Sequence, residues 1–377
     1  MNLPVYLDYN ATTPVAPQVA DAIEPYLRQH FGNPSSTHVY GRTARAAVER
    51  AHEQLAELLG ARSAEIIFTG CATEANNLAI RGVARALRQR GRHVITSAVE
   101  HPSVLQPMRR LQEDGWDVTV LPVDAEGRVD PAKLARALRD DTVLVSIMHA
   151  NNEVGTVQPI AEIAALTRMR GIVLHCDAAQ SVGKILVSVE DLGVDMLTVA
   201  GHKFYAPKGV GALYVRTGTP IAPLLVGADH EHGLRPGTEN VPGVVGAGAA
   251  AQLAAYAMAD NVARIRALRD RLHDLLKAAI PDIVLNGHPS ERLPNTLNVS
   301  FPNVSARLLL EHAADDVAAS VGSACHGADD TVSGVLAAMG IAPQRARGAV
   351  RLSLGEPTTA SDIERAAQAL IRAWGAL

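Results

Sequence analysis

The chain is poor in cysteine and has no block of basic residues. Its 377 residues include only three cysteines, Cys71, Cys176 and Cys325, which lie far apart in the sequence. This spacing offers no set of metal ligands and no disulfide framework, so we expect no metal and a reducing, cytoplasmic setting. The formal net charge is −4, and without clustered Lys and Arg we expect no direct contact with nucleic acid.

Long hydrophobic runs are missing as well. The first residues, MNLPVYLDYN, lack the basic and then apolar segments of a signal peptide, so we expect no such leader. The least polar stretch, 241–258, carries no charge but consists mostly of Gly and Ala. It is too weakly apolar to predict a membrane span, and we expect a tightly packed buried or interface helix there.

Short β-rich runs alternate with helical patterns through the first two thirds of the chain. The candidate strands are Glu65–Thr69, His93–Ser97, Val118–Pro122, Val143–Met148, Ile172–Cys176, Met196–Ala200 and Gly211–Val215. Helical patterns such as Glu74–Gln89 and Pro131–Leu138 lie between several of them. Strands that alternate with helices favour an α/β fold with a mostly parallel sheet covered on both faces.

The sequence changes character from about residue 260. A charged amphipathic helix is predicted over Asn261–Ala278, followed by strands at Thr296–Ser300 and Ala349–Leu354 and a last helix at Ser361–Trp374. This order of elements indicates a smaller α+β domain.

Lys203 is the most informative residue in the chain. It lies in the run AGHKFYAPKGVGAL, directly after an apolar stretch. Apolar surroundings disfavour the charged ammonium group, and a lysine with a lowered pKa is a nucleophile that can form a Schiff base with a carbonyl. The position would also suit a lysine whose stem lies on apolar surface while its ammonium group reaches solvent.

Three further polar residues follow candidate strands. Asp177 comes at the end of an apolar strand, where it could pair with a protonated ring nitrogen or cap the next helix. Asn152, within HANNEVG, could line a polar pocket or belong to a turn. His101 follows a third strand, although a lone histidine is more often structural.

The turn before Thr73 suits a phosphate group. A strand, a tight turn and a helix start follow one another over residues 65–74, and helix N-termini attract anions, although simple capping explains the pattern equally well. Strand ends converge in α/β sheets, which would bring His101, Asn152, Asp177 and the pair His202-Lys203 into one crevice. A Schiff-base lysine, a ring-nitrogen partner and a phosphate turn together point to pyridoxal phosphate.

The motifs around these residues resemble those of a known enzyme family. They are YLDYNATTPV, GNPSSTHVYGRTAR, TEANNLAI, EHPSVL, HANNEVGTVQPI, DAAQSVGK, GHKFYAPKGVGALYV, GLRPGTENV, NTLNVSF, GSACHG and RLSLG. In this order, and over nearly the whole chain, they resemble the cysteine desulfurases of the class V aminotransferase superfamily, in the group with a long cysteine loop.

This resemblance implies a fold and an assembly. It implies a fold type I pyridoxal-phosphate transferase, with a large domain around a mostly parallel seven-stranded sheet and a smaller α+β domain. The large cofactor-binding domain would span residues 15–258, and residues 1–14 plus 259–377 would form the small domain that carries the catalytic cysteine. The resemblance also implies a homodimer.

The resemblance further implies the roles of the residues around the cofactor. Lys203 would hold the cofactor as a Schiff base and later move the Cα proton of the substrate. Asp177 would pair with the pyridine nitrogen, Gln180 would hydrogen-bond the ring hydroxyl, and His101 would stack on the ring and serve in acid–base steps. The residues implied to contact the phosphate are Thr73, His202 and, from the other subunit, Thr238.

Substrate and sulfur complete the implied reaction. Asn152 and Arg351 would bind the carboxylate of L-cysteine, for which a planar guanidinium is suited. Cys325 lies among small and polar residues that predict a mobile, exposed loop. Its thiolate would attack the sulfur of the bound cysteine, leaving L-alanine and a persulfide for an acceptor protein, such as an iron–sulfur scaffold or an enzyme of tRNA thiolation or DNA phosphorothioation.

The chain departs from the family pattern in places. Ala200 stands where many members have a serine that contacts the phosphate, and residues 227–233 read GADHEHG instead of a triple glycine. His230 and His232 in that run could suggest a metal, but the rim of the active-site entrance is the better explanation. Cys71 stands where small residues are common, and we assign it no catalytic role. A selenocysteine lyase or a sulfur-relay scaffold with weak activity are the alternative functions, whereas a plain aminotransferase would have no use for Cys325.

Overall fold

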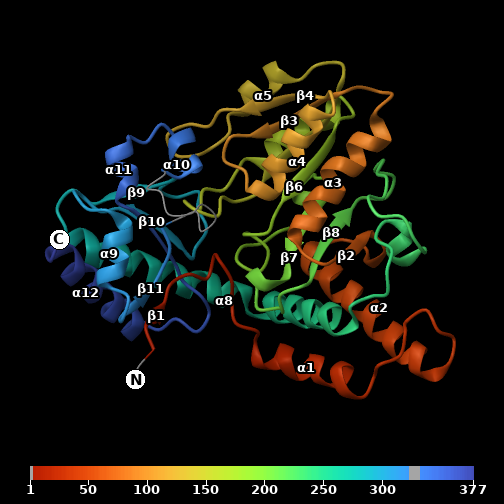
Figure 1. Cartoon of the computed structure of the whole chain (residues 1–377), viewed down its shortest axis with the longest axis horizontal. Coiled ribbons are helices and arrows are strands. Elements are labelled where there is room, and N and C mark those ends of the chain that lie inside the picture. The colour runs from red at the N-terminus through yellow and green to blue at the C-terminus, as the bar shows by residue number, and fades with distance from the viewer. Residues whose placement is uncertain (1–2, 322–331) are drawn as a thin grey trace.

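The computed structural model describes residues 3–321 and 332–377, and its chain forms a large and a small part joined by one long helix (Figure 1). The strands of the large part are β2 (Ile66–Thr69), β3 (His93–Ser97), β4 (Asp117–Leu121), β5 (Thr142–Met148), β6 (Val173–Asp177), β7 (Met196–Ala200) and β8 (Gly211–Val215). Its helices are α1 (Pro17–Arg28), α2 (Val39–Leu59), α3 (Ala72–Leu87), α4 (Pro102–Glu113), α5 (Pro131–Ala137), α6 (Ile160–Met169) and α7 (Val189–Leu192).

The large part is built on a seven-stranded sheet with the order β2-β8-β7-β6-β5-β3-β4. Only β8 runs antiparallel to its neighbours, so the predicted mostly parallel α/β sheet is confirmed. The seven candidate strands are all present, with ends that differ by at most one residue. Because β3, β5, β6 and β7 are parallel, their carboxyl ends lie along one edge of the sheet, which we call the carboxyl edge.

Both faces of this sheet are buried, which explains the apolar composition of its strands. In β2, Ile66 and Phe68 belong to a core cluster shared with α2, α6 and α8, whereas Ile67 packs in a second cluster with α3 and α4. Side chains that alternate between two cores are what the two-residue period of a strand produces. The helices therefore enclose the sheet and leave the carboxyl edge as the place for polar residues.

The small part contains a three-stranded antiparallel sheet of β9 (Val284–Asn286), β10 (Thr296–Ser300) and β12 (Ala349–Ser353), with β10 in the middle. Its helices are α9 (Ala306–His312), α10 (Gly334–Ala338), α11 (Pro343–Arg347) and α12 (Ala360–Gly375). Near the N-terminus, β1 (Val5–Tyr6) pairs in parallel with β11 (Val317–Ala318). The start of the chain thus joins the small part before it enters the large one.

The joining helix, α8 (Val241–Ala279), is continuous over 39 residues. The sequence predicted its two halves separately and placed a domain boundary at residue 258; α8 crosses this position without a break, and the division stays a prediction. Its glycines permit close packing, because a Cβ at Gly248 would lie 2.7 Å from the Cα of Ala51 in α2. By length and composition alone, α8 is also long and apolar enough to cross a membrane. A core helix passes the same test, and α8 packs along α1, α2 and α12.

Candidate active site

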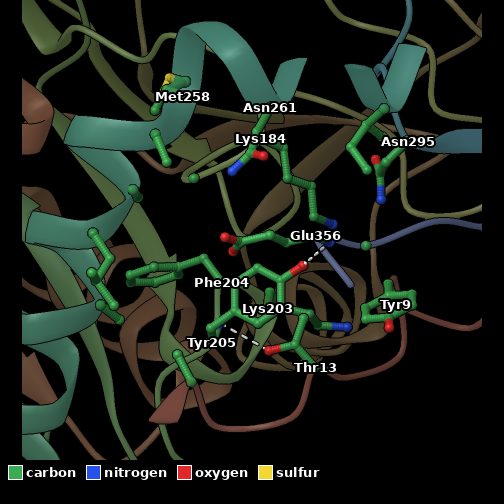
Figure 2. Close-up of a pocket in the computed structure, with 18 of the residues that line it drawn as sticks. Tyr9, Thr13, Lys184, Lys203, Phe204, Tyr205, Met258, Asn261, Asn295 and Glu356 are labelled. Atoms are coloured by element: carbon green, nitrogen blue, oxygen red, sulfur yellow. Dashed lines mark hydrogen bonds between the residues drawn. The ribbon is translucent and has the colours of Figure 1, made fainter. Parts of the chain in front are cut away.

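The amine of Lys203 is held by the N-terminal segment. Lys203 ends a short turn, Gly201–Lys203, that follows β7. Its Nζ donates hydrogen bonds to the main-chain oxygens of Asn10 and, at 3.0 Å, of Ala11. Figure 2 shows this lysine beside Thr13, at a cavity whose wall includes α8. Lys203 is therefore part of a polar network and not a surface lysine that reaches into solvent.

Asn10 connects this lysine to both parts of the molecule. Its side chain is 1% exposed, and its Oδ1 accepts hydrogen bonds from Lys184 Nζ and Asn295 Nδ2, both at 3.0 Å. Its Nδ2 donates to Thr296 Oγ1 at 2.8 Å in β10 of the small part. Asn10 thus links the Lys203 amine, from which its main-chain oxygen accepts a hydrogen bond, to the small sheet, to which its side chain donates.

A second lysine lies close to the first. The Nζ of Lys184 donates to Gln180 Oε1 at 2.7 Å, and the Nε2 of Gln180 donates to the main-chain oxygen of Asn10 at 3.0 Å. Burial lowers the pKa of Lys184 well below its usual range, and the nearby charges of Lys203 and Arg351 lower it further. Both ends of the Gln180 amide bond to protein groups, so its contact with a cofactor hydroxyl stays a prediction.

At the carboxyl edge, four side chains form a continuous row of hydrogen bonds. Asp177, at the end of β6 and 5% exposed, accepts from Asn76 Nδ2 of α3 at 2.7 Å. The same amide donates to Ser103 Oγ at 2.8 Å, and Ser103 Oγ lies 2.8 Å from His101 Nδ1. Asp177 also accepts from the backbone N–H of Ala179. The carboxylate is therefore held in place by donors from two elements.

The row fixes the tautomer of His101. Its Nδ1 accepts the backbone N–H of Ser103 at 3.1 Å, so the neutral ring carries its proton on Nε2. Burial lowers the pKa of His101, Asp177 raises it and Lys203 lowers it. Because both charges act on this ring, the three residues share one electrostatic environment, as the convergence of strand ends predicted.

The residues predicted to contact a phosphate lie at two neighbouring turns. Thr73 is in the first turn of α3, and the N-cap is Cys71, whose sulfur accepts the Glu74 N–H at 3.4 Å. Thr73 and His101 line one recess between α3 and α4. Burial, together with the nearby lysines, lowers the pKa of His202 to about 4, so this ring is neutral near pH 7.

Thr238 is exposed in the segment before α8. Two ion pairs anchor this segment, Arg235 to Glu74 at 2.9 Å and Glu231 to His52 at 3.1 Å. An exposed position is compatible with the predicted contact to another subunit, which stays a prediction. No three His, Cys, Asp or Glu side chains within residues 3–321 and 332–377 are arranged to hold a metal ion, His230 and His232 included.

The predicted carboxylate-binding pair is brought together. Arg351 in β12 is 4% exposed. Its Nη1 donates to the main-chain oxygen of Asn152 at 3.1 Å, and its Nη2 donates to Asp8 Oδ1 at 2.8 Å. Its buried Nε has no hydrogen-bond partner among the described residues. The Asp8 carboxylate orients the guanidinium, and Nε is a donor left for a ligand.

Cys325 lies outside the described residues, but the chain on both sides of it starts from this site. Ser320 exchanges two backbone hydrogen bonds with Arg351, at 3.3 and 2.8 Å. On the other side, Ser333 Oγ donates to Glu153, the residue after Asn152. The described residues on either side of this gap therefore contact Arg351 and the neighbour of Asn152, the predicted substrate pair.

These groups fit pyridoxal phosphate. The site offers a lysine amine, a fixed buried carboxylate, an imidazole and a helix N-terminus, which match a carbonyl, a ring nitrogen, an aromatic ring and a phosphate. Asn76 Oδ1 is, like Arg351 Nε, buried without a hydrogen-bond partner among the described residues. Polar groups at the site are therefore available to a ligand.

Sequence reasoning missed several residues that build the site. Asn76 occurs inside the predicted helix Glu74–Gln89, Ser103 and Lys184 lie outside the predicted elements, and Asn10 and Asp8 precede the first candidate strand. Their family motifs, YLDYNATTPV, TEANNLAI, EHPSVL and DAAQSVGK, contained the signal. Nothing in the local pattern indicated that their side chains bond to the predicted residues.

Comparisons with known proteins agree on one family. The aminotransferase class-V family matches residues 5–366. Cysteine desulfurase IscS of Dictyoglomus turgidum is 49% identical over 364 residues, which cover 96% of this chain and 92% of the relative. A solved NifS-like protein superposes with a TM-score of 0.94, at 37% identity and full coverage of both chains. SspA in complex with cysteine superposes with a TM-score of 0.83, at 37% identity, covering 93% of this chain and 98% of that one.

Proposed function

We propose a role for each residue of this site. The premise is that the chain belongs to the aminotransferase class-V family and is a cysteine desulfurase. Enzymes of this family depend on pyridoxal phosphate. The reaction converts L-cysteine to L-alanine and delivers the sulfur to a cysteine thiol. The observation that carries the residue assignments is the meeting of Lys203, Asp177 and Arg351 around the carboxyl edge and the N-terminal segment.

The hydrogen-bond geometry supports the assignment of the cofactor residues. Bound pyridoxal phosphate supplies a carbonyl and an electron sink. Lys203 would hold its carbonyl carbon, Asp177 its ring nitrogen, and Thr73 and His202 its phosphate. Asn76 keeps the Asp177 carboxylate in place at 2.7 Å. With its neutral ring and its proton on Nε2, His101 is able to stack on the cofactor and to move a proton.

Arg351 and Asn152 would bind the carboxylate of L-cysteine. Support comes from the Nε of Arg351, which has no hydrogen-bond partner in residues 3–321 and 332–377, and from the Asp8 carboxylate, which bonds to Nη2 of the same guanidinium. The related SspA was solved with cysteine bound. Once the carboxylate is held there, the amine of Lys203 is the group that would move the Cα proton.

Cys325 would take the sulfur. Its thiolate attacks the sulfur atom of the bound cysteine, an S–S bond forms as the C–S bond breaks, and a proton replaces sulfur on Cβ, so that L-alanine and a Cys325 persulfide result. The short connections from Ser320 and Ser333 to the substrate pair support this assignment. The persulfide then passes to a thiol of an acceptor protein, such as an iron–sulfur scaffold or a thiolation enzyme.

The enzyme would act as a cytoplasmic homodimer without binding nucleic acid or a membrane itself. The exposed Thr238, which follows a stretch anchored by two ion pairs, supports the dimer because such a residue can reach a second subunit. The three widely spaced cysteines support a reducing compartment. The net charge of −4 supports an acceptor that is a protein.

Two variants test this function. Lys203→Ala should abolish both the visible absorbance of the lysine-bound cofactor and the release of alanine, whereas Lys277→Ala, on the exposed face of α8, should change neither.

Cys325→Ala should keep the absorbance but stop sulfide release, whereas Cys71→Ser should retain sulfide release. Alanine release by Lys203→Ala at the wild-type rate would exclude the assignment of Lys203. Unchanged sulfide release by Cys325→Ala would exclude Cys325 as the sulfur carrier.

A further inference from the structure

Tyr205 has an unusual backbone two residues after Lys203. Its φ is +72°, in the left-handed region that favours glycine and asparagine. Within the part of the chain that the structure describes, five non-glycine residues have a positive φ, and Tyr205 is the one next to the Lys203 turn. A large aromatic residue keeps such a conformation only where its surroundings hold it. Its contacts therefore need an explanation.

The main chain of Tyr205 is bonded to the N-terminal segment. Its N–H donates to Thr13 Oγ1 at 2.8 Å, as Figure 2 shows, and its carbonyl accepts from Ala16 N at 3.1 Å. Thr13 N in turn donates to the His202 oxygen at 2.9 Å. The Lys203 turn and the N-terminal segment are thus joined on both sides of the lysine.

The side chain of Tyr205 reaches the small part of the molecule. Its phenol oxygen accepts the backbone N–H of Glu356 at 2.6 Å, as Figure 2 also shows. Arg264 of α8 holds the carbonyl of Glu356 at 2.6 Å. Glu356 follows β12, the strand of Arg351, by three residues. Burial raises the pKa of Tyr205, so its phenol remains neutral and keeps its hydroxyl.

We propose that Tyr205 is a positioning residue that keeps Lys203 in register with Arg351. With a left-handed backbone, Tyr205 bonds through its main chain to Thr13 and Ala16 and, at the same time, through its phenol to the N–H of Glu356. This connection from Lys203 to Arg351 consists of two residues of chain, one hydrogen bond and five residues of chain, and it is separate from the one through Asn10 and Asp8. This inference rests on the proposed function, in which Lys203 moves a proton of a substrate that Arg351 holds.

The separation of Lys203 and Arg351 matters at one step of the reaction. Binding the carboxylate needs Arg351 and Asn152 but not Lys203, whereas moving the Cα proton needs Lys203 and Arg351 at a fixed separation. Loss of the phenol bond should therefore lower kcat and leave KM for L-cysteine nearly unchanged. A purely structural role would lower the melting temperature and leave kcat and KM of the folded enzyme as they were.

The test compares Tyr205→Phe and Tyr205→Asn with Tyr256→Phe, which removes a hydroxyl from an 83% exposed side chain of α8. Hydrogen exchange of the Glu356 amide is measured without cofactor, and kcat and KM are measured with it. For Tyr205→Phe we expect the exchange to rise and kcat to fall about fivefold, the effect of one lost hydrogen bond, with KM within about twofold. Tyr205→Asn tolerates the left-handed backbone and should lose as much kcat, whereas Tyr256→Phe should match the wild type.

Two results would overturn the inference: equal Glu356 exchange in the wild type and Tyr205→Phe, or raised exchange with an unchanged kcat. Failure of the proposed function is recognised separately, because then the wild type itself would release no alanine from L-cysteine. The exchange measurement needs no activity and still reports whether the phenol bond exists.

Discussion

The carboxyl edge of the sheet and the N-terminal segment 8–16 hold their functional groups in different ways. At the edge, Asp177, Asn76 and Ser103 bond side chain to side chain at 2.7 and 2.8 Å, and each side chain is set on a strand or helix. In the segment, Lys203 is bonded to main-chain oxygens of Asn10 and Ala11. The carboxyl edge thus supplies functional side chains of its own, whereas the N-terminal segment positions the amine of Lys203.

This difference predicts how the two regions respond to mutation. Removing an edge side chain removes a charge or a proton-transfer group directly, and no neighbour replaces it. Removing a segment side chain leaves the main-chain oxygens that bond Lys203 but loosens their support from both parts of the molecule. We expect larger effects on catalysis from the edge and larger effects on stability from the segment.

The largest effect is expected for Asp177→Asn. The variant keeps the size of the side chain and can still accept from Asn76, but it loses the negative charge that pairs with the cofactor ring. Breaking a buried ion pair costs about 3–5 kcal/mol, which corresponds to a loss in kcat on the order of 10²–10⁴-fold. Steady-state release of alanine measures it.

Asp191→Asn is the matched control for this variant, because Asp191 is an exposed carboxylate on α7. It should retain wild-type kcat. A loss of less than about threefold in Asp177→Asn, a factor within the scatter of surface changes, would show that the edge does not present the essential charge.

A smaller catalytic effect and a larger loss of stability are expected for Asn10→Ala. The change leaves the groups of Lys184, Asn295 and Thr296 without this partner. Buried polar groups that lose their partners should lower the free energy of unfolding by about 2–4 kcal/mol and kcat by roughly tenfold. Chemical denaturation and alanine release measure the two.

The control for Asn10→Ala is Gln252→Ala, which removes an exposed amide that bonds only to Gln54 among the described residues. It should change stability by less than about 0.5 kcal/mol. If Asn10→Ala reduced kcat as much as Asp177→Asn without loss of stability, the distinction between the two regions would be wrong.

Much of the edge could be predicted from the sequence, because its signals are local. Strands of five to seven buried residues, such as β5 and β7, appear as apolar runs, and the polar residue that follows each run lies at the carboxyl edge. His101, Asn152, Asp177 and Lys203 were found in this way.

The N-terminal segment could not be predicted by the same reasoning. Asn10 bonds to residues 174 and 286 positions away, and neither partner shares a local pattern with it. The continuity of α8 was also missed, because its first half is rich in Gly and Ala and packs along α1 and α2, whereas its second half is charged and packs against α12. Contacts over such separations follow from the assembled fold and not from periodicity.

The smallest effect on catalysis is expected within the strand of Asp177 itself. His175 lies two residues before Asp177 but is fully buried inside the sheet, where its ring bonds to Ser146 Oγ at 2.8 Å and Thr198 Oγ1 at 3.0 Å. Burial lowers its pKa from 6.5 to about 4. Between these two values the unfolded chain binds a proton that the folded chain does not, so wild-type stability falls as the pH decreases through this range.

His175→Gln cannot take up that proton, so its free energy of unfolding should depend less on pH. The loss of stability between pH 6.5 and 4 should be smaller than in the wild type by on the order of 3 kcal/mol. Denaturation at several pH values measures it, while kcat above pH 6.5 should remain close to wild type. Parallel stability curves for the two proteins would mean that His175 titrates normally, and a large loss of kcat would place it with Asp177 among the residues that serve the reaction.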